Sequence, residues 1–250
     1  MADAQTVPTL DRFHAREIAR LCVEQFQIAA EQRLELAGYH LAMVAKTLLE
    51  NDIVDRPVVV LAGRGNKGRA GLIAARHLLN WGAWVQVVCT HPPDDFAGGA
   101  AQALSTLQMM GVPLAWAEEG WELPPSDLLI DAILGTGLHG TPHGKARDLI
   151  QLANSSAAPI LSLDLPSGVD ADTGETLVPH MRAAATLALG LPLRGLLASA
   201  ARAASGELYL GDVGLPLALY EEMGLAVTPI FSRDPIVRWD VVEGEARLLV

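Results

Sequence analysis

Three stretches of the sequence carry residues that could form a ligand site: one glycine-rich loop and two segments in which an acidic residue is followed by glycine. Residues 63–71 read GRGNKGRAG and follow a short apolar run, so backbone N–H groups and a helix N-terminus could face an anion there. Asp131 lies in the apolar run LLIDAI and precedes the glycine-rich segment GTGLHGTPHG. Asp164 follows ILSL and begins DLPSGVDADTGE. Two carboxylates and an anion-binding loop at one edge of a sheet would form a charged binding site.

The first loop also invites a dinucleotide-binding interpretation. Gly63, Gly65 and Gly68 match G-x-G-x-x-G. That pattern normally has an Asp or Glu about 20 residues later to bind the ribose, at the end of the next strand. Here the next apolar run leads into Thr90 and His91 instead. An ordinary NAD-dependent oxidoreductase is therefore disfavoured, while a glycine turn without a ligand and loop-capping carboxylates stay open as alternatives.

Other reactive residue types lack the spacing that their usual chemistry needs. The sequence has neither a nucleophile elbow with an ordered Ser, Asp and His nor an H-E-x-x-H motif, which removes the basis for a hydrolase or a metalloprotease. Cys22 and Cys89 are too few for a disulfide framework or a zinc cluster. In the second loop, the N–H groups of residues 135–140 are stronger ligand candidates than His139 or His143. His40 is interpreted as a core or surface histidine.

Composition narrows the class of partner. The chain has 250 residues, half of them hydrophobic, with a formal net charge of −11. This charge argues against a nucleic acid or an acidic membrane as the main partner, but a local glycine-rich pocket could still hold a phosphorylated ligand. No apolar run is long enough to span a membrane and no signal peptide is recognised, so we expect a cytoplasmic protein.

The elements that must position these residues alternate along the chain. We expect helices at residues 9–26, 28–49, 72–81, 99–110, 145–154 and 198–204, and strands at 58–62, 84–89, 112–116, 128–133, 160–163, 185–189 and 207–210. Short apolar runs between helices predict an α/β fold with mostly parallel strands covered on both faces, the last strand lying at an antiparallel edge. A single domain over residues 1–250 is expected, with a helical segment at about 9–50, a sheet core at about 57–216 and an unplaced tail at about 232–250.

The first helix carries a less regular pattern than the others. Its apolar residues are Leu10, Phe13, Ile18, Leu21 and Val23, which are predicted to face the core. The residue at position 9 is a threonine, which we expect to cap the helix N-terminus.

Four segments together resemble the YjeF N-terminal domain family, the NAD(P)HX epimerases. They read DLLIDAILGTGLHG, PILSLDLPSGVDADTGE, ALGLPLRGLL and GELYLGDVGLP, and the similarity runs from about residue 9 to 216. The resemblance implies a three-layer Rossmann-like fold, frequent homodimers, and interconversion of the R and S forms of hydrated NADH and NADPH. It also implies a dehydratase partner, which we expect on a separate chain.

Matched residue by residue, the resemblance implies a role for each motif. Asp164 is the expected acid/base residue, acting near the C6 hydroxyl of the hydrated ring. The potassium ligands of the family fall on position 67, Asp131 and Ser167. The implied substrate-binding residues are Asn66, Lys67, Gly68, Arg69, Ala70, Gly135, Thr136, Gly137, Leu138, His139, Gly140, Thr141 and Asp164.

The first loop departs from the family pattern. Residues 65–71 read GNKGRAG where the family has G-N-N-G-G-D-G, so Lys67 replaces an Asn and Ala70 an Asp, and Leu193 replaces a Lys further on. These changes predict weakened or altered activity. The alternative is a diverged module that binds a nucleotide as a sensor or scaffold without catalysis.

The Lys67 substitution carries its own expectation. An ammonium group has three donors and no acceptor, so it cannot ligate potassium. We expect its charge to replace the ion, with the amine about 2.7–3.2 Å from an Asp131 oxygen and beside the Ser167 hydroxyl. The alternative is that Lys67 points into solvent and the ion site is lost or empty.

Overall fold

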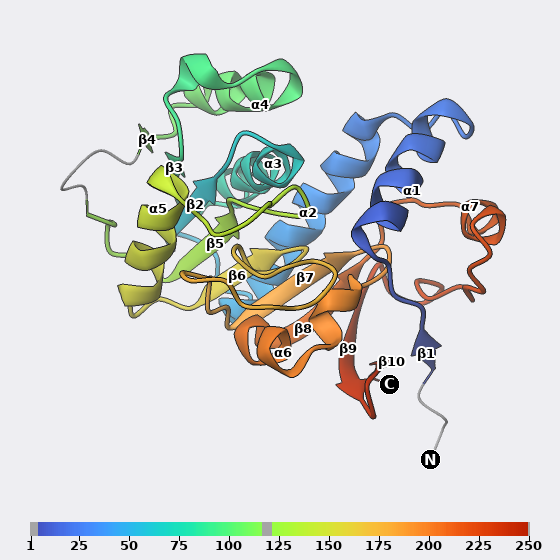
Figure 1. Ribbon diagram of the computed structural model, residues 1–250. Coiled ribbons are helices and arrows are strands. Elements are labelled where there is room, and N and C mark those ends of the chain that lie inside the picture. Colours follow the sequence, from blue (N-terminus) through green and yellow to red (C-terminus); the bar gives the residue numbers. More distant parts are fainter. Residues whose placement is uncertain (1–4, 117–121, 250) are drawn as a thin grey trace.

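A ten-stranded sheet with helices on both faces forms the centre of the computed structural model, which describes residues 5–116 and 122–249 (Figure 1). The ends of the predicted domain, residues 1–4 and 250, lie outside the described part. In sheet order the strands are β1 (Thr6–Val7), β10 (Glu245–Leu248), β9 (Ile236–Val242), β8 (Glu207–Gly211), β7 (Ala185–Leu189), β6 (Ile160–Leu163), β5 (Leu128–Ala132), β2 (Pro57–Ala62), β3 (Trp84–Cys89) and β4 (Leu114–Trp116). The helices are α1 (Arg12–Glu24), α2 (Ala30–Leu48), α3 (Asn66–Asn80), α4 (Gly98–Met109), α5 (Gly144–Ser155), α6 (Ser199–Ser205) and α7 (Leu217–Glu222), with short 3₁₀ helices at Pro93–Asp95 and Arg194–Leu197. Among the described helices, none combines the length and the apolar character that a membrane crossing needs.

The strands from β4 to β8 pair in parallel, and those from β8 to β1 pair antiparallel. The predicted mostly parallel α/β sheet is therefore confirmed. The prediction that the strand at 207–210 forms an edge is wrong, because β8 lies between parallel β7 and antiparallel β9. The tail that the sequence left unplaced supplies β9 and β10.

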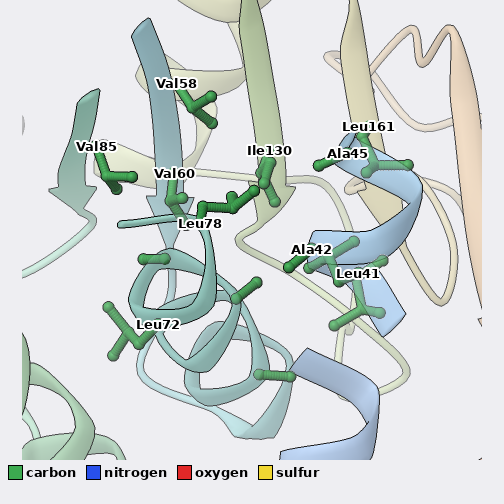
Figure 2. Close-up of a cluster of buried hydrophobic side chains, with 14 of the residues drawn as sticks. Leu41, Ala42, Ala45, Val58, Val60, Leu72, Leu78, Val85, Ile130 and Leu161 are labelled. Carbon is green, nitrogen blue, oxygen red and sulfur yellow. The ribbon is translucent and has the colours of Figure 1, made fainter. Parts of the chain in front are cut away.

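The side chains on the two faces of β2 pack in two different parts of the hydrophobic core. Val58, Val60 and Ala62 pack with residues of α2, α3 and α4. Figure 2 shows Val58 and Val60 in this cluster beside labelled side chains of α2 and α3. Val59 and Leu61 pack on the opposite face with residues of α5. Burial on both faces explains why parallel strands appear in the sequence as continuous apolar runs.

Helix α3 begins earlier than predicted. It starts at Asn66, so Gly68 and Gly71 lie inside the helix and not in a loop as the sequence was interpreted. A β-carbon at Gly71 would lie 2.4 Å from the Ala132 Cβ atom, and one at Gly68 would lie 1.8 Å from the Gly63 carbonyl oxygen. These glycines therefore let the helix approach the strand ends closely, although glycine disfavours helices by itself.

This close approach predicts a large effect for Gly68→Ala. The added methyl group collides with main-chain atoms, which cannot rotate away, so we expect a loss of about 3 kcal/mol in the free energy of unfolding and a melting temperature roughly 6–12 °C lower. Gly137→Ala is the matched control, since a β-carbon at Gly137 meets no atom within 4 Å. Thermal unfolding of both variants checks the prediction, and an unchanged Gly68→Ala midpoint would contradict it.

The expected face of the first helix is only partly correct. Ile18 is buried as predicted, but Phe13 is 70% exposed and Val23 47% exposed, and Cys22 is buried instead. The predicted cap is also wrong, because α1 begins at Arg12 and Asp11 accepts a hydrogen bond from the His14 N–H group. In the second helix, His40 is buried, in agreement with the core interpretation.

The C-terminal hairpin completes the antiparallel end of the sheet. Trp239 of β9 is 1% exposed, and its indole N–H donates to the Tyr209 carbonyl oxygen at 3.2 Å. Glu243 and Gly244 form the turn with positive φ angles, and β10 then pairs with β1. The hairpin thereby covers a β8 strand that would otherwise present unpaired backbone groups.

Candidate active site

The chain changes direction across the sheet between β2 and β5. From β2 it continues through β3 to β4 on one side, and from β5 it continues through β6 and β7 to β8 on the other. The carboxyl ends of β2 and β5 are held together because the Gly63 N–H group donates to the Ala132 carbonyl oxygen at 2.9 Å. A reversal of this kind opens a crevice beyond the strand ends, where ligands of open α/β sheets bind.

A cavity of about 530 Å³ lies at this position. Of the predicted substrate-binding residues, eight line it: Asn66, Lys67, Ala70, Gly135, Thr136, Gly137, Leu138 and Asp164. The two glycine-rich segments and the end of β6 therefore meet in one cavity, as their places in the sequence predicted. Its size is within the range of cavities that hold a small organic ligand.

Five residues of the predicted set are not among the cavity lining. They are Gly68, Arg69, His139, Gly140 and Thr141. Gly68 is used for helix packing, and the Arg69 guanidinium lies 3.1 Å from the Glu31 carboxylate of α2. Arg69 therefore joins two helices and does not face the cavity.

Several lining residues were not selected from the sequence. Arg16 reaches the cavity from α1, Arg64 comes from the first loop, and Thr90 and His91 follow β3. The Thr90 hydroxyl lies 2.8 Å from the His91 Nδ1 atom, and burial and the nearby Arg64 charge lower the pKa of His91. Thr90 and His91 could have been predicted as lining residues because they directly follow a parallel strand. No local sequence pattern identifies Arg16.

Asp164 has an unusual backbone at the cavity. Its φ angle is +66°, a left-handed conformation that Asp and Asn adopt more readily than most residues. Its N–H group donates to the Leu187 carbonyl oxygen of β7 at 2.6 Å, which fixes the turn after β6. Burial raises the pKa of Asp164 to about 6, while the Lys67 charge opposes the rise. A carboxyl group that titrates near neutral pH suits proton transfer.

Asp131 is the centre of a buried polar cluster. It is fully buried, and its Oδ2 atom accepts hydrogen bonds from the Ser162 hydroxyl and the Ser167 N–H group, both at 2.8 Å. Its Oδ1 atom accepts from the Ile133 N–H group at 3.2 Å and from the Ser167 hydroxyl at 2.5 Å. These bonds hold the carboxylate in one orientation at the carboxyl end of β5.

The Lys67 amine enters this cluster. Its Nζ atom lies 3.1 Å from both Asp131 Oδ2 and Ser167 Oγ, and 3.0 and 2.8 Å from the carbonyl oxygens of Leu134 and Leu165. The side chain is 7% exposed, so the alternative in which Lys67 points into solvent is wrong. Burial lowers the pKa of Lys67, and the Asp131 charge opposes that shift. The sequence did not identify the two main-chain carbonyls. Within the described residues, no cluster of three or more His, Cys, Asp or Glu residues could hold a metal ion.

Comparison with known proteins agrees with this geometry. Residues 30–195 match the family model of the YjeF-related protein N-terminus. The chain is 38% identical to the NAD(P)H-hydrate epimerase of Dehalogenimonas lykanthroporepellens over 227 residues, which cover 88% of this chain and 85% of that protein. It is 32% identical to the bifunctional NAD(P)H-hydrate repair enzyme Nnr of Moorella thermoacetica, covering 81% of this chain but 40% of that longer protein.

A solved structure supports the same assignment at the level of the fold. The crystal structure of yeast ynu0 superposes with a TM-score of 0.78 at 24% identity, covering 93% of this chain and all of the yeast chain. The predicted Rossmann-like architecture is thus shared with a known protein. The matched family model and the identity to the curated relatives show that this chain belongs to the YjeF N-terminal domain family.

Proposed function

We propose that the protein is an epimerase of hydrated nicotinamide nucleotides, interconverting the R and S forms of NADHX and NADPHX. The observation that carries the proposal is Asp164, a carboxyl group with a pKa of about 6 at the wall of a cavity bounded by two glycine-rich segments. The curated relatives named NAD(P)H-hydrate epimerase support the same activity.

The cavity offers the groups that an anionic nucleotide needs. Helix α3 begins at its wall, and the N-cap Gly65 makes no side-chain cap, so N–H groups of the first turn are available to phosphate oxygens. Arg16 and Arg64 add positive charge to the lining of a protein whose net charge is −11. We assign phosphate binding to this first loop and nucleoside binding to residues 135–138.

Asp164 is assigned the proton transfer at the reacting carbon. For the other epimer to form, the bond between C6 and the ring nitrogen N1 must break and re-form on the opposite face of C6. In the first half of the reaction, the Asp164 carboxylate accepts the proton of the C6 hydroxyl, the C6–O bond becomes a carbonyl, and the electron pair of the C6–N1 bond stays on N1. In the second half, N1 attacks the opposite face of the carbonyl and Asp164 returns the proton to the oxygen. A pKa near 6 allows both transfers close to neutral pH.

The protonation state of Asp164 predicts the pH dependence. The reaction begins from the carboxylate, so the rate should rise with pH through an apparent pKa near 6 and fall about tenfold per pH unit below it. Measuring kcat/KM between pH 4.5 and 8 checks this. A rate that is constant over that range would remove Asp164 from the proton-transfer role.

The direct test of the activity uses one purified epimer of hydrated NADH. Incubation with the protein should produce the second epimer faster than in buffer alone, and chromatography separates the two forms. Accumulation at the rate of the buffer control would contradict the proposal.

We further propose that the protein acts as a homodimer and that a dehydratase on a separate chain uses its product. The resemblance to the family supports the dimer. Relatives named bifunctional NAD(P)H-hydrate repair enzymes support a partner with a second activity; this chain covers about 40% of the length of two of them.

A further inference from the structure

The cluster around Lys67 has the composition of a site for a monovalent cation. Four oxygen atoms surround the Lys67 nitrogen at 2.8–3.1 Å, two from main-chain carbonyls, one from a hydroxyl and one from a carboxylate. In potassium channels, backbone carbonyl oxygens replace the hydration shell of the ion, so a group of carbonyl oxygens is a suitable environment for it. The cluster also carries one negative charge, on Asp131, so a cation of single charge balances it.

Helix stability does not explain a lysine at this position. Lys67 is the second residue of α3, where the helix dipole disfavours positive charge by roughly 0.3–1 kcal/mol. A lysine also loses side-chain entropy when it is held in one conformation. The contacts that offset these costs are those to the Asp131 carboxylate and to the carbonyl oxygens of Leu134 and Leu165.

The carbonyl oxygens require a donor or a cation. Those of Leu134 and Leu165 converge on the nitrogen from two different loops, and both can only accept hydrogen bonds. A neutral amine would point its lone pair at one of the surrounding oxygens, whereas the ammonium form offers three donors. The arrangement therefore selects a positive charge at the nitrogen position.

The residues present do not fit a potassium ion. The ammonium nitrogen lies where an ion bound by these four oxygens would lie, and it has a similar size and the same charge. An added cation would meet both a steric overlap and an unscreened like charge in a buried position. The potassium site that the family resemblance implied is therefore not available in this chain.

We propose that Lys67 is a tethered monovalent cation that takes the place of potassium and, given the proposed function, makes epimerisation independent of potassium. Its charge also acts on Asp164, where it opposes the effect of burial on the carboxyl pKa. The site thus keeps a fixed positive charge next to its acid/base residue whatever the ionic composition of the solution.

The experiment compares three proteins in equal concentrations of potassium, sodium and choline chloride, without any nucleotide. The wild type should unfold at the same temperature in all three salts. Lys67→Asn supplies an amide oxygen and removes the amine, so its melting temperature should be higher in potassium than in choline by several degrees. Lys67→Met fills the same space without an oxygen and is the matched control, with no potassium response.

Crystals of the wild type and of Lys67→Asn soaked in rubidium chloride give a second readout. Anomalous scattering should show rubidium beside Asp131 Oδ2 in the variant and no peak there in the wild type. A potassium-specific stabilisation of the wild type, a rubidium peak beside its Asp131, or a folded Lys67→Asn protein that ignores potassium would each overturn the proposal. If Lys67→Asn fails to fold in every salt, the proposal is tested by the wild type alone: by its melting temperature in the three salts and by the presence or absence of a rubidium peak beside its Asp131. None of these readouts depends on epimerase activity, so they fail or succeed separately from the proposed function.

Discussion

Replacing Asp164 by asparagine should lower the rate of epimerisation by orders of magnitude and should also raise the melting temperature of the protein. Asparagine keeps the shape and tolerates the φ angle of +66°, so the fold should be retained. It cannot exchange a proton, so the rate should fall by a factor of about 10²–10⁴. The measurements are kcat with one purified epimer and thermal unfolding at pH 7.

The stability change follows from the direction of the pKa shift. The folded protein raises the pKa of Asp164 from 3.8 to about 6, so the folded state holds the proton more tightly than the unfolded state. The favourable contribution of Asp164 is therefore present below pH 4, is lost as the pH rises through 6, and becomes a cost at pH 7. Asparagine removes that cost, and we expect a rise of roughly 2–6 °C.

Asp148→Asn is the matched control for this variant. Asp148 lies on the exposed part of α5, where its carboxylate contacts Arg147 at 2.8 Å, and it is not among the cavity lining. Its replacement should leave the rate unchanged and should not raise the melting temperature. Near-normal turnover by Asp164→Asn would show that another group transfers the proton.

Replacing Lys67 by methionine should cause a large loss of stability. Methionine has a similar length, but it leaves the buried Asp131 carboxylate without its cation and the Leu165 carbonyl oxygen without the Lys67 donor. The Leu134 carbonyl oxygen also loses Lys67 and keeps only the Ser167 hydroxyl, at 3.1 Å. Breaking a buried charge pair costs about 3–5 kcal/mol, because the remaining charge is uncompensated. We expect the melting temperature to fall by about 10 °C.

Two further variants test whether the stability loss of Lys67→Met comes from the broken ion pair with Asp131 and not from removing a lysine in general. Lys145→Met in the first turn of α5 removes a positive charge from a helix N-terminus, where that charge is unfavourable, so stability should hardly change. The double variant Lys67→Met with Asp131→Asn removes the unpaired charge and should recover part of the lost stability. A Lys67→Met protein as stable as the wild type would mean that the ion pair with Asp131 contributes little.

The sheet could be predicted because its signal is local. Residues such as Val58, Val60 and Leu61 are buried on both faces of a parallel sheet, and this burial produces short apolar runs in the sequence. The start of α3 could not be predicted in the same way. Gly68 disfavours a helix locally and is selected by its approach to Gly63, a contact that only the folded chain reveals.

Some contacts of the candidate site could likewise be predicted from the sequence, whereas others depend on the folded chain. The contact between Lys67 and Asp131 could be expected because the family resemblance places position 67 and Asp131 at one ion site, and an amine beside a carboxylate forms an ion pair. The carbonyl oxygens of Leu134 and Leu165 could not be foreseen, because their directions depend on how two loops turn after β5 and β6. Arg16 reaches the cavity from α1. The buried face of this helix was predicted incorrectly, because Phe13 and Val23 are apolar but exposed.

The pairing of β1 with β10 places the first and last strands of the described chain side by side. Thr6 lies opposite Arg247, and the Leu248 N–H group donates to the Gln5 carbonyl oxygen at 3.0 Å. In sheet order, five strands separate β1 from β5, and the cavity lies beyond the carboxyl end of β5. Figure 1 shows β1 and β5 far apart in the sheet. A protein fused near Thr6 or near Leu248 would therefore be attached at the β1 edge of the sheet, far from the cavity. A variant in which a short peptide links the segment at Thr6 to that at Leu248, with new ends in an exposed loop away from the cavity, should therefore keep the cavity intact.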